Sequence, residues 1–133
     1  MGVLIDASVL VAAERGQLDF QQVARGRAEE PVGIATITAS ELLHGVHRAD
    51  TEARRHRREA WVESLLAAIP ALPFDLTAAR IHARLWAQLL AAGVTVGAHD
   101  LLVAATALSA GFSVASRDLR SFPRIPGLSV EHW

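Results

Sequence analysis

Short apolar runs rich in β-branched residues alternate along the chain with longer segments whose apolar positions recur at helical spacing. Five runs have the length and composition of strands: residues 3–5, 32–35, 72–74, 112–115 and, more weakly, 128–130. Helical periodicity covers residues 8–14, 18–28, 38–69, 75–92 and 99–110. Strands that alternate with helices indicate a parallel sheet covered on both faces. The pattern therefore predicts a three-layer α/β/α domain.

Residues suited to helix ends occur at several of these boundaries. Ser8 is placed to cap the first helix. Thr38 and Glu41, three residues apart, have the form of a capping box at the start of a later helix. Gly93 and Gly111 stand where helices commonly end in a left-handed glycine. These residues predict where the helices begin and end.

The size and composition of the chain limit its architecture and its environment. With 133 residues and 51% hydrophobic content, we expect a single domain spanning residues 1–133. Cysteine is absent, so any metal must be held by oxygen or imidazole ligands. No apolar run reaches about 18 residues and no basic leader is evident, so we expect a cytoplasmic protein without membrane contact.

The net charge and the types of basic residue exclude several classes of function. The net charge is −1, so the whole molecule is not an electrostatic nucleic-acid binder and any contact with RNA must be local. All thirteen basic residues are arginine, and the absence of lysine excludes a P-loop, a Schiff-base enzyme and a phospho-aspartate receiver domain.

The densest basic segment covers residues 48–59. Its arginines are candidates for contacts with RNA phosphates: Arg54, Arg55, Arg57 and Arg58. A solvated helix face with local ion pairs explains the same pattern, so both interpretations stay open.

Four acidic residues lie at element boundaries on the expected carboxyl edge of the sheet, where binding crevices form in such folds. They are Asp6 after the first strand, Glu41 and Asp100 near helix starts, and Asp118 beyond the run at 112–115. Four carboxylates would repel one another unless a divalent cation neutralised them, and Mg²⁺ or Mn²⁺ prefers oxygen ligands. Taken singly, each acid is equally typical of a turn or a helix cap. Spacing alone leaves both interpretations open.

Four segments of the chain resemble the motifs of PIN-domain ribonucleases, in particular VapC toxins. They are LIDASVL at 4–10, ITASELLHG at 37–45, VGAHDLLVAA at 96–105, and ASRD at 115–118 followed by Phe122 and IPGL at 125–128. They occur in the family's order and span essentially the whole chain, although Ala7 replaces the commoner threonine.

The resemblance implies a PIN fold with a five-stranded parallel sheet and assigns roles to the acids. Asp6, Glu41 and Asp100 would form an acidic core that binds Mg²⁺ or Mn²⁺, with Asp118 as a more variable fourth acid. Ser116 would support the metal and its waters. Members often carry a further acid, at a second metal subsite, where this chain has Ser121, so the chain departs from the family pattern at that position.

The implied activity is endoribonucleolytic cleavage of a structured RNA, commonly a tRNA or ribosomal RNA, that inhibits translation. The implied partners are a VapB antitoxin and a second copy of the chain in a homodimer. One alternative is a non-catalytic PIN fold that binds RNA or protein. A phosphatase of the haloacid-dehalogenase type is disfavoured because Ser8 stands where that chemistry needs a second aspartate.

Overall fold

A computed structural model describes residues 1–23 and 25–133 and has a five-stranded sheet at its centre. The strands are β1 (Val3–Ile5), β2 (Val32–Ala35), β3 (Ala71–Leu72), β4 (Ser113–Ser116) and β5 (Val130–His132). Their order in the sheet is β3-β2-β1-β4-β5, and every neighbouring pair is parallel. The expected parallel sheet is confirmed.

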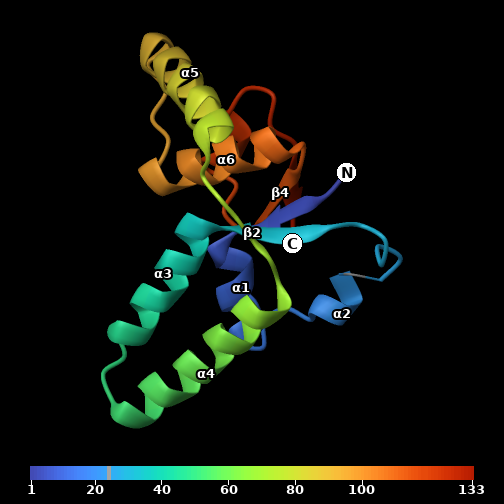
Figure 1. The fold of residues 1–133 in the computed structure, drawn as a ribbon, viewed down its shortest axis with the longest axis vertical. Helices are drawn as coiled ribbons and strands as arrows, with labels where there is room; N and C mark the ends of the chain where they lie inside the picture. The colour runs from blue at the N-terminus through green and yellow to red at the C-terminus, as the bar shows by residue number, and fades with distance from the viewer. Residues whose placement is uncertain (24) are drawn as a thin grey trace.

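Helices cover both faces of this sheet. They are α1 (Ala7–Glu14), α2 (Phe20–Val23), α3 (Thr36–His47), α4 (Glu52–Ala68), α5 (Leu76–Ala92) and α6 (Ala98–Ala110), with a 3₁₀ helix at Phe122–Arg124. Figure 1 shows α5 and α6 on one side of the strands and α1, α3 and α4 on the other. The three-layer α/β/α class predicted from the sequence is confirmed.

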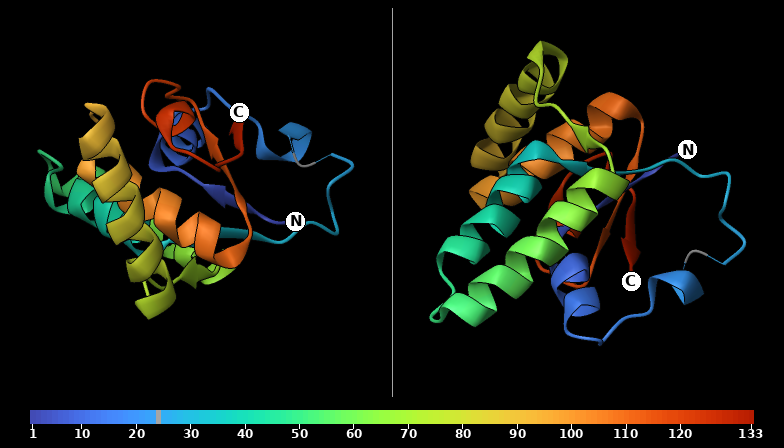
Figure 2. Two further views of the ribbon diagram at one scale, coloured as in Figure 1. Left: turned by 90° about the horizontal axis from the view of Figure 1, so that it is seen from above. Right: turned by 60° about the horizontal axis from the view of Figure 1, so that its bottom comes forward.

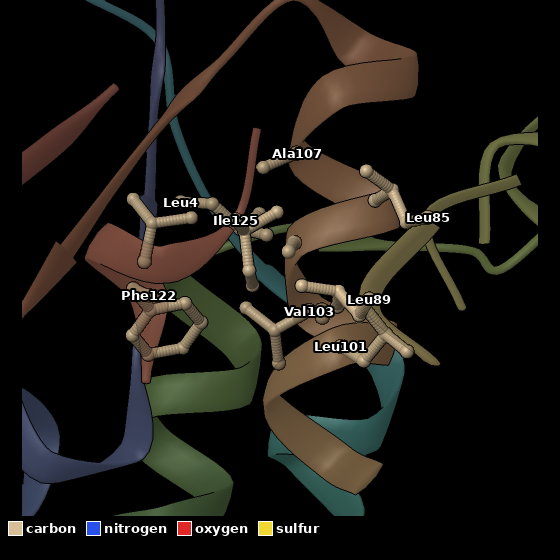
Figure 3. Packing of buried hydrophobic residues seen from close by; sticks show 11 residues of the cluster. Leu4, Leu85, Leu89, Leu101, Val103, Ala107, Phe122 and Ile125 are labelled. Atoms are coloured by element: carbon tan, nitrogen blue, oxygen red, sulfur yellow. The ribbon is translucent and has the colours of Figure 1, made fainter. Parts of the chain in front are cut away.

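Two hydrophobic cores form because successive strand residues point to opposite faces. Leu4 of β1 belongs to one core together with Phe122 and with Leu85 and Leu89 of α5, and Figure 3 shows Val103 and Ile125 between them. The next residue, Ile5, enters a second core with buried residues of α1, α3 and α4. The central strand therefore contributes to both cores, and its carboxyl end lies between them.

The helix expected over residues 18–28 is wrong for the described part of that range. Only Phe20–Val23 is helical, while residue 24 lies outside the described chain. Gly26 has a φ of 81°, which does not continue a right-handed helix. Arg27 forms ion pairs with Glu30 and with Glu131 of β5, 104 residues away, so a long-range contact decides the conformation of this segment.

The single helix expected over residues 38–69 is instead two helices. Thr51 has extended backbone and its hydroxyl accepts a hydrogen bond from the Arg54 amide over 3.1 Å, which starts α4 anew. Figure 2 shows α3 and α4 side by side as a hairpin. The arginine-rich segment is therefore divided between a turn and the first half of α4.

The capping box expected at Thr38 and Glu41 is also wrong. The helix α3 begins two residues earlier, at Thr36, and Thr38 is buried inside it. Glu41 consequently lies in the second turn and its carboxylate has no capping role. Gly93 and Gly111 do end α5 and α6 in the left-handed conformation, as predicted, with φ of 69° and 72°. Within residues 1–23 and 25–133, no helix combines the length and the hydropathy needed to cross a bilayer.

Candidate active site

Asp6 lies directly after β1, at the carboxyl end of the central strand, and is only 8% exposed. The hydroxyls of Ser8 and Ser116 lie 2.7 and 3.0 Å from its Oδ2 and can donate to it. The Ser8 amide also donates to this oxygen over 3.4 Å, so Asp6, rather than Ser8, is the N-cap of α1. Among the described residues, no hydrogen bond reaches Oδ1. That oxygen is therefore available to another ligand.

The two serines join the ends of neighbouring strands at this point. Ser116 is the fully buried last residue of β4, which pairs with β1. Its Oγ lies 3.3 Å from Ser8 Oγ and accepts a hydrogen bond from the Asp118 amide over 3.0 Å. The Arg117 amide donates to Ser8 Oγ over 3.0 Å. Ser116 thus contacts Asp6 itself, and its role beside a metal and its waters stays a prediction. The contribution of Ser8 was missed because its spacing suggested only a helix cap.

Glu41 projects from the second turn of α3, near the first turn of α6. Burial raises the pKa of its carboxyl group, and the nearby charges of Asp6 and Asp100 raise it further. His99 opposes this effect, with its Nδ1 3.9 Å from Glu41 Oε1. Glu41 thus belongs to a group of acids that destabilise one another's charged forms.

Asp100 lies in the first turn of α6. Burial raises the pKa of its carboxyl group, and the negative charges of Asp6 and Asp118 add to this rise. A contact with the Ser121 hydroxyl and the proximity of His99 lower it. Ser121 therefore faces this carboxylate. Asp6, Glu41 and Asp100 are close enough to influence one another, as expected from their places at the sheet edge.

Asp118 is placed differently from the other three acids. Its Oδ1 and Oδ2 each accept a hydrogen bond of 3.0 Å from the Arg120 guanidinium. This pairing lowers the pKa of Asp118 below its usual range. The carboxylate is therefore neutralised by an arginine at the periphery of the acidic group.

The donor chemistry of this acidic group suits a hard divalent cation, because carboxylate and hydroxyl oxygens predominate and His99 adds one imidazole beside Glu41. In the described ranges, 1–23 and 25–133, no three His, Asp or Glu side chains are spaced to hold a metal ion as they stand. Coordination by Asp6, Glu41 and Asp100 would need movement of these side chains. Burial, and to a smaller extent the neighbouring carboxylates, raise the pKa values of Glu41 and Asp100, and a bound cation would stabilise their charged forms.

This charge has a measurable consequence for stability. In EDTA, we expect Asp100→Asn to melt at a higher temperature than wild type, because the folded state disfavours the charged carboxylate. For the same reason, wild-type stability should rise as the pH falls through the raised pKa of folded Asp100 toward the ordinary pKa of an aspartate, because the folded state binds the proton first. Addition of Mg²⁺ or Mn²⁺ should reverse the order, since a ligand at a hundred times its Kd stabilises the folded state by about 2.7 kcal/mol.

Differential scanning fluorimetry with and without metal checks this result. The exposed Glu63→Gln on α4 is the matched control, and it should melt like wild type in both conditions. If Asp100→Asn melts below wild type in EDTA, and metal stabilises both equally, Asp100 is not part of a cation site.

The predicted RNA-binding arginines lie on α4. Three of them have carboxylate partners: Arg54 with Asp50, Arg55 with Glu52 and Arg58 with Glu14. Arg57 is exposed and has no ion pair within the described chain. The structure therefore brings these arginines together on one hairpin but pairs most of their charges locally.

One family of known proteins matches nearly the whole chain. Residues 3–128 match the PIN domain. The chain belongs to the PIN-domain family. The resemblance inferred from the four sequence motifs is thereby confirmed.

Relatives of this PIN-domain chain include VapC proteins. It is 36% identical to ribonuclease VapC1 of Rickettsia felis over 131 residues, which cover 98% of this chain and 95% of that protein. It is 35% identical to the tRNA(fMet)-specific endonuclease VapC of Salmonella typhimurium over 75% of this chain and 74% of that protein. The solved structure of DNA-bound VapBC from Salmonella typhimurium matches with a TM-score of 0.90 at 26% identity, covering 100% and 98% of the two chains.

Proposed function

We propose that this PIN-domain protein is the ribonuclease toxin of a cytoplasmic VapBC pair and that it cuts RNA with the help of Mg²⁺ or Mn²⁺. The observation that carries the proposal is the group formed by Asp6, Glu41 and Asp100 at the carboxyl edge of the sheet. The relative named as a tRNA(fMet)-specific endonuclease supports a tRNA, or another structured RNA such as rRNA, as the substrate class. Cleavage of such an RNA would inhibit translation.

Each residue of the site has a definite part in this proposal. Oδ1 of Asp6, together with the carboxylates of Glu41 and Asp100, would hold the cation. When bound, such a cation offsets the charge of the phosphodiester and lowers the pKa of water at the site. Ser8 and Ser116 hold Oδ2 of Asp6 and so fix the orientation of its carboxylate. Because the chain has no cysteine or lysine, and the hydroxyls of Ser8 and Ser116 are directed to Asp6, water is the nucleophile that this group of acids is suited to activate.

The direct test is incubation of the purified protein with bacterial tRNA and with ribosomal RNA. We expect cleavage in Mn²⁺ or Mg²⁺ and none in EDTA. Asp100→Asn purified in the same way controls for contaminating nucleases. Intact RNA after incubation with excess protein in both metals would contradict the proposal.

A non-catalytic role in binding RNA or protein is the second candidate. It is favoured by one observation, that the described acids are not spaced to hold a metal ion without moving. The melting experiment separates the two candidates, because a non-catalytic module has no need for metal stabilisation that depends on Asp100.

The proposed partners are a VapB antitoxin and a second copy of the chain. A solved relative is a VapBC complex, which supports the first. The second is supported by an apolar surface on α5, where Trp86 is 56% and Leu90 is 69% exposed beside a pocket of about 370 Å³. Large exposed side chains of this kind mark interaction surfaces, and a twofold-related copy presents the same surface in return.

Trp86→Glu should therefore shift the protein from dimer to monomer in size-exclusion chromatography with light scattering. Burial of an unpaired charge in such an interface is strongly unfavourable. Gln88→Glu, which adds the same charge on an exposed position of α5, should leave the dimer intact. A wild-type protein that is monomeric at all concentrations would remove this part of the proposal.

A further inference from the structure

A cleft of about 740 Å³ lies where the α3–α4 hairpin meets the end of α1. Its charged lining consists of Arg48, Arg54, Arg57 and Arg58 with Glu14 and Asp50. Four arginines against two acids leave this cleft with two excess positive charges, although the whole chain carries a net charge of −1. The cleft is therefore positively charged, although the molecule as a whole carries a small negative charge.

The arginines of this cleft are not equivalent. Arg54 contributes two short hydrogen bonds to Asp50, and Arg58 pairs with Glu14 over 3.3 Å. Arg48 and Arg57 are exposed, and neither has a carboxylate or hydrogen-bond partner for its side chain in the parts of the chain described here. Their charges are the ones left for an external anion. A guanidinium can donate two parallel hydrogen bonds to a phosphate or a carboxylate.

The cleft begins close to the acidic group. Arg58 donates from Nη1 to the carbonyl oxygen of Gly45 over 3.3 Å, and Gly45 is one helical turn beyond Glu41 on α3. At 1.5 Å per residue, Gly45 is about 6 Å and Arg48 about 10 Å along the helix from Glu41. Successive charges on one strand of a duplex are about 3.4 Å apart along its axis. A strand that runs along α3 would therefore cover the 6–10 Å from Glu41 to Gly45 and Arg48 in roughly two to three nucleotides.

The cleft also has an aromatic wall. Trp61 of α4, which is partly buried, lines it beside the arginines. Aromatic side chains next to a positively charged groove are typical of surfaces on which the bases of a nucleic acid stack. An acidic peptide could satisfy the arginines, but it would make no use of the short path from the cleft to Glu41.

From these observations we infer that the cleft binds the phosphates of the RNA substrate two to three nucleotides from the bond that is cut, through Arg48 and Arg57. The inference rests on the proposed ribonuclease function and adds a second point of contact to it. It also revises the sequence-based assignment, because Arg48 replaces Arg54 and Arg55, whose charges are paired. Arg58 has a structural role instead, because it connects α4 to Glu14 of α1 and to Gly45 of α3.

The test compares Arg48→Ala/Arg57→Ala with wild type in EDTA, where metal-dependent cleavage is absent. The probe is a fluorescein-labelled 17-nucleotide RNA hairpin with a seven-nucleotide loop, and its anisotropy is measured from 50 to 200 mM NaCl. We expect Kd to rise about tenfold. The slope of log Kd against log salt should fall by about 1.4–1.8, which corresponds to two lost phosphate contacts.

Arg80→Ala/Arg84→Ala is the matched control, because it removes two exposed arginines from α5. It should change Kd by less than twofold and leave the slope as in wild type. Circular dichroism should show that both double variants are folded. Equal losses in the two variants, or an unchanged slope in Arg48→Ala/Arg57→Ala, would overturn the inference.

A labelled octaglutamate peptide tests whether the cleft binds an acidic protein segment instead of RNA. If Arg48→Ala/Arg57→Ala loses the peptide but keeps the RNA, the cleft is a site for acidic protein segments and the inference is wrong. If RNA binding depends on these arginines but the wild-type protein fails to cut RNA in Mn²⁺, RNA binding by the cleft is supported and the proposed ribonuclease function is contradicted. If the wild-type protein cuts RNA but its RNA binding does not depend on these arginines, only the assignment of RNA binding to the cleft is wrong.

Discussion

Asp100→Asn is expected to lower the metal-dependent cleavage of RNA by about a thousandfold or more, which corresponds to roughly 4 kcal/mol of transition-state stabilisation. The substitution keeps the shape of the side chain and removes its charge. Asp100 lies in the first turn of α6 within the electrostatic range of Asp6, so the proposed cation would lose one of its three anionic ligands. Cleavage rates of a labelled tRNA in Mn²⁺ measure the effect.

Two further variants make this result specific to the site. Asp118→Asn should cost less than about tenfold, because Arg120 already neutralises that carboxylate and an indirect contribution of this kind is small. Asp19→Asn, at an exposed position before α2, should have no effect. If Asp6→Asn and Asp100→Asn both cut RNA at the wild-type rate, the acidic group is not the active site.

Phe122→Ala is expected to lower the free energy of unfolding by about 3–5 kcal/mol, the range for removal of a buried phenylalanine ring. Phe122 is 1% exposed and packs with Leu4 and Ile125 in the core between the sheet and α5–α6 (Figure 3). The ring also anchors the loop that carries Asp118 and Ser121. Its loss would thus loosen one side of the acidic group as well as the core.

Urea unfolding followed by circular dichroism measures this change. Leu119→Ala is the matched control on the same loop, since Leu119 is 48% exposed and should alter the stability by no more than about 0.5 kcal/mol. A value for Phe122→Ala within 1 kcal/mol of wild type would show that the ring does not hold the loop against the core.

The sequence predicted the sheet and the three central acids because those features depend on local patterns. Buried parallel strands are short apolar runs, and residues that directly follow them share one edge of the sheet. Asp6 directly follows β1, and Asp100 lies at the start of the helix that leads back into the neighbouring strand β4, so both could be placed at this edge without coordinates. The glycine ends of α5 and α6 were predictable for a similar reason, since a left-handed residue at a helix end favours glycine.

The errors arose where a distant contact, an adjoining strand or a loop conformation decides the local structure. The segment at 18–28 was predicted as a helix, but Arg27 bonds to Glu131 on the far edge of the sheet. Thr38 and Glu41 matched a capping box, yet α3 starts earlier because it follows β2 without a break. The pairing of Asp118 with Arg120 depends on the loop conformation, which the sequence does not encode in a recognisable pattern.

The position of Asp6 after the central strand has a consequence for local unfolding. Leu4 and Ile5 pack into cores on opposite faces of the sheet, so β1 is held from both sides. Transient opening of one helical layer still leaves the strand paired with β2 and β4 and packed on the other layer. The carboxylate of Asp6 at its end therefore keeps its place through partial opening events, whereas Glu41 on α3 or Asp100 on α6 leaves the acidic group when its own layer opens.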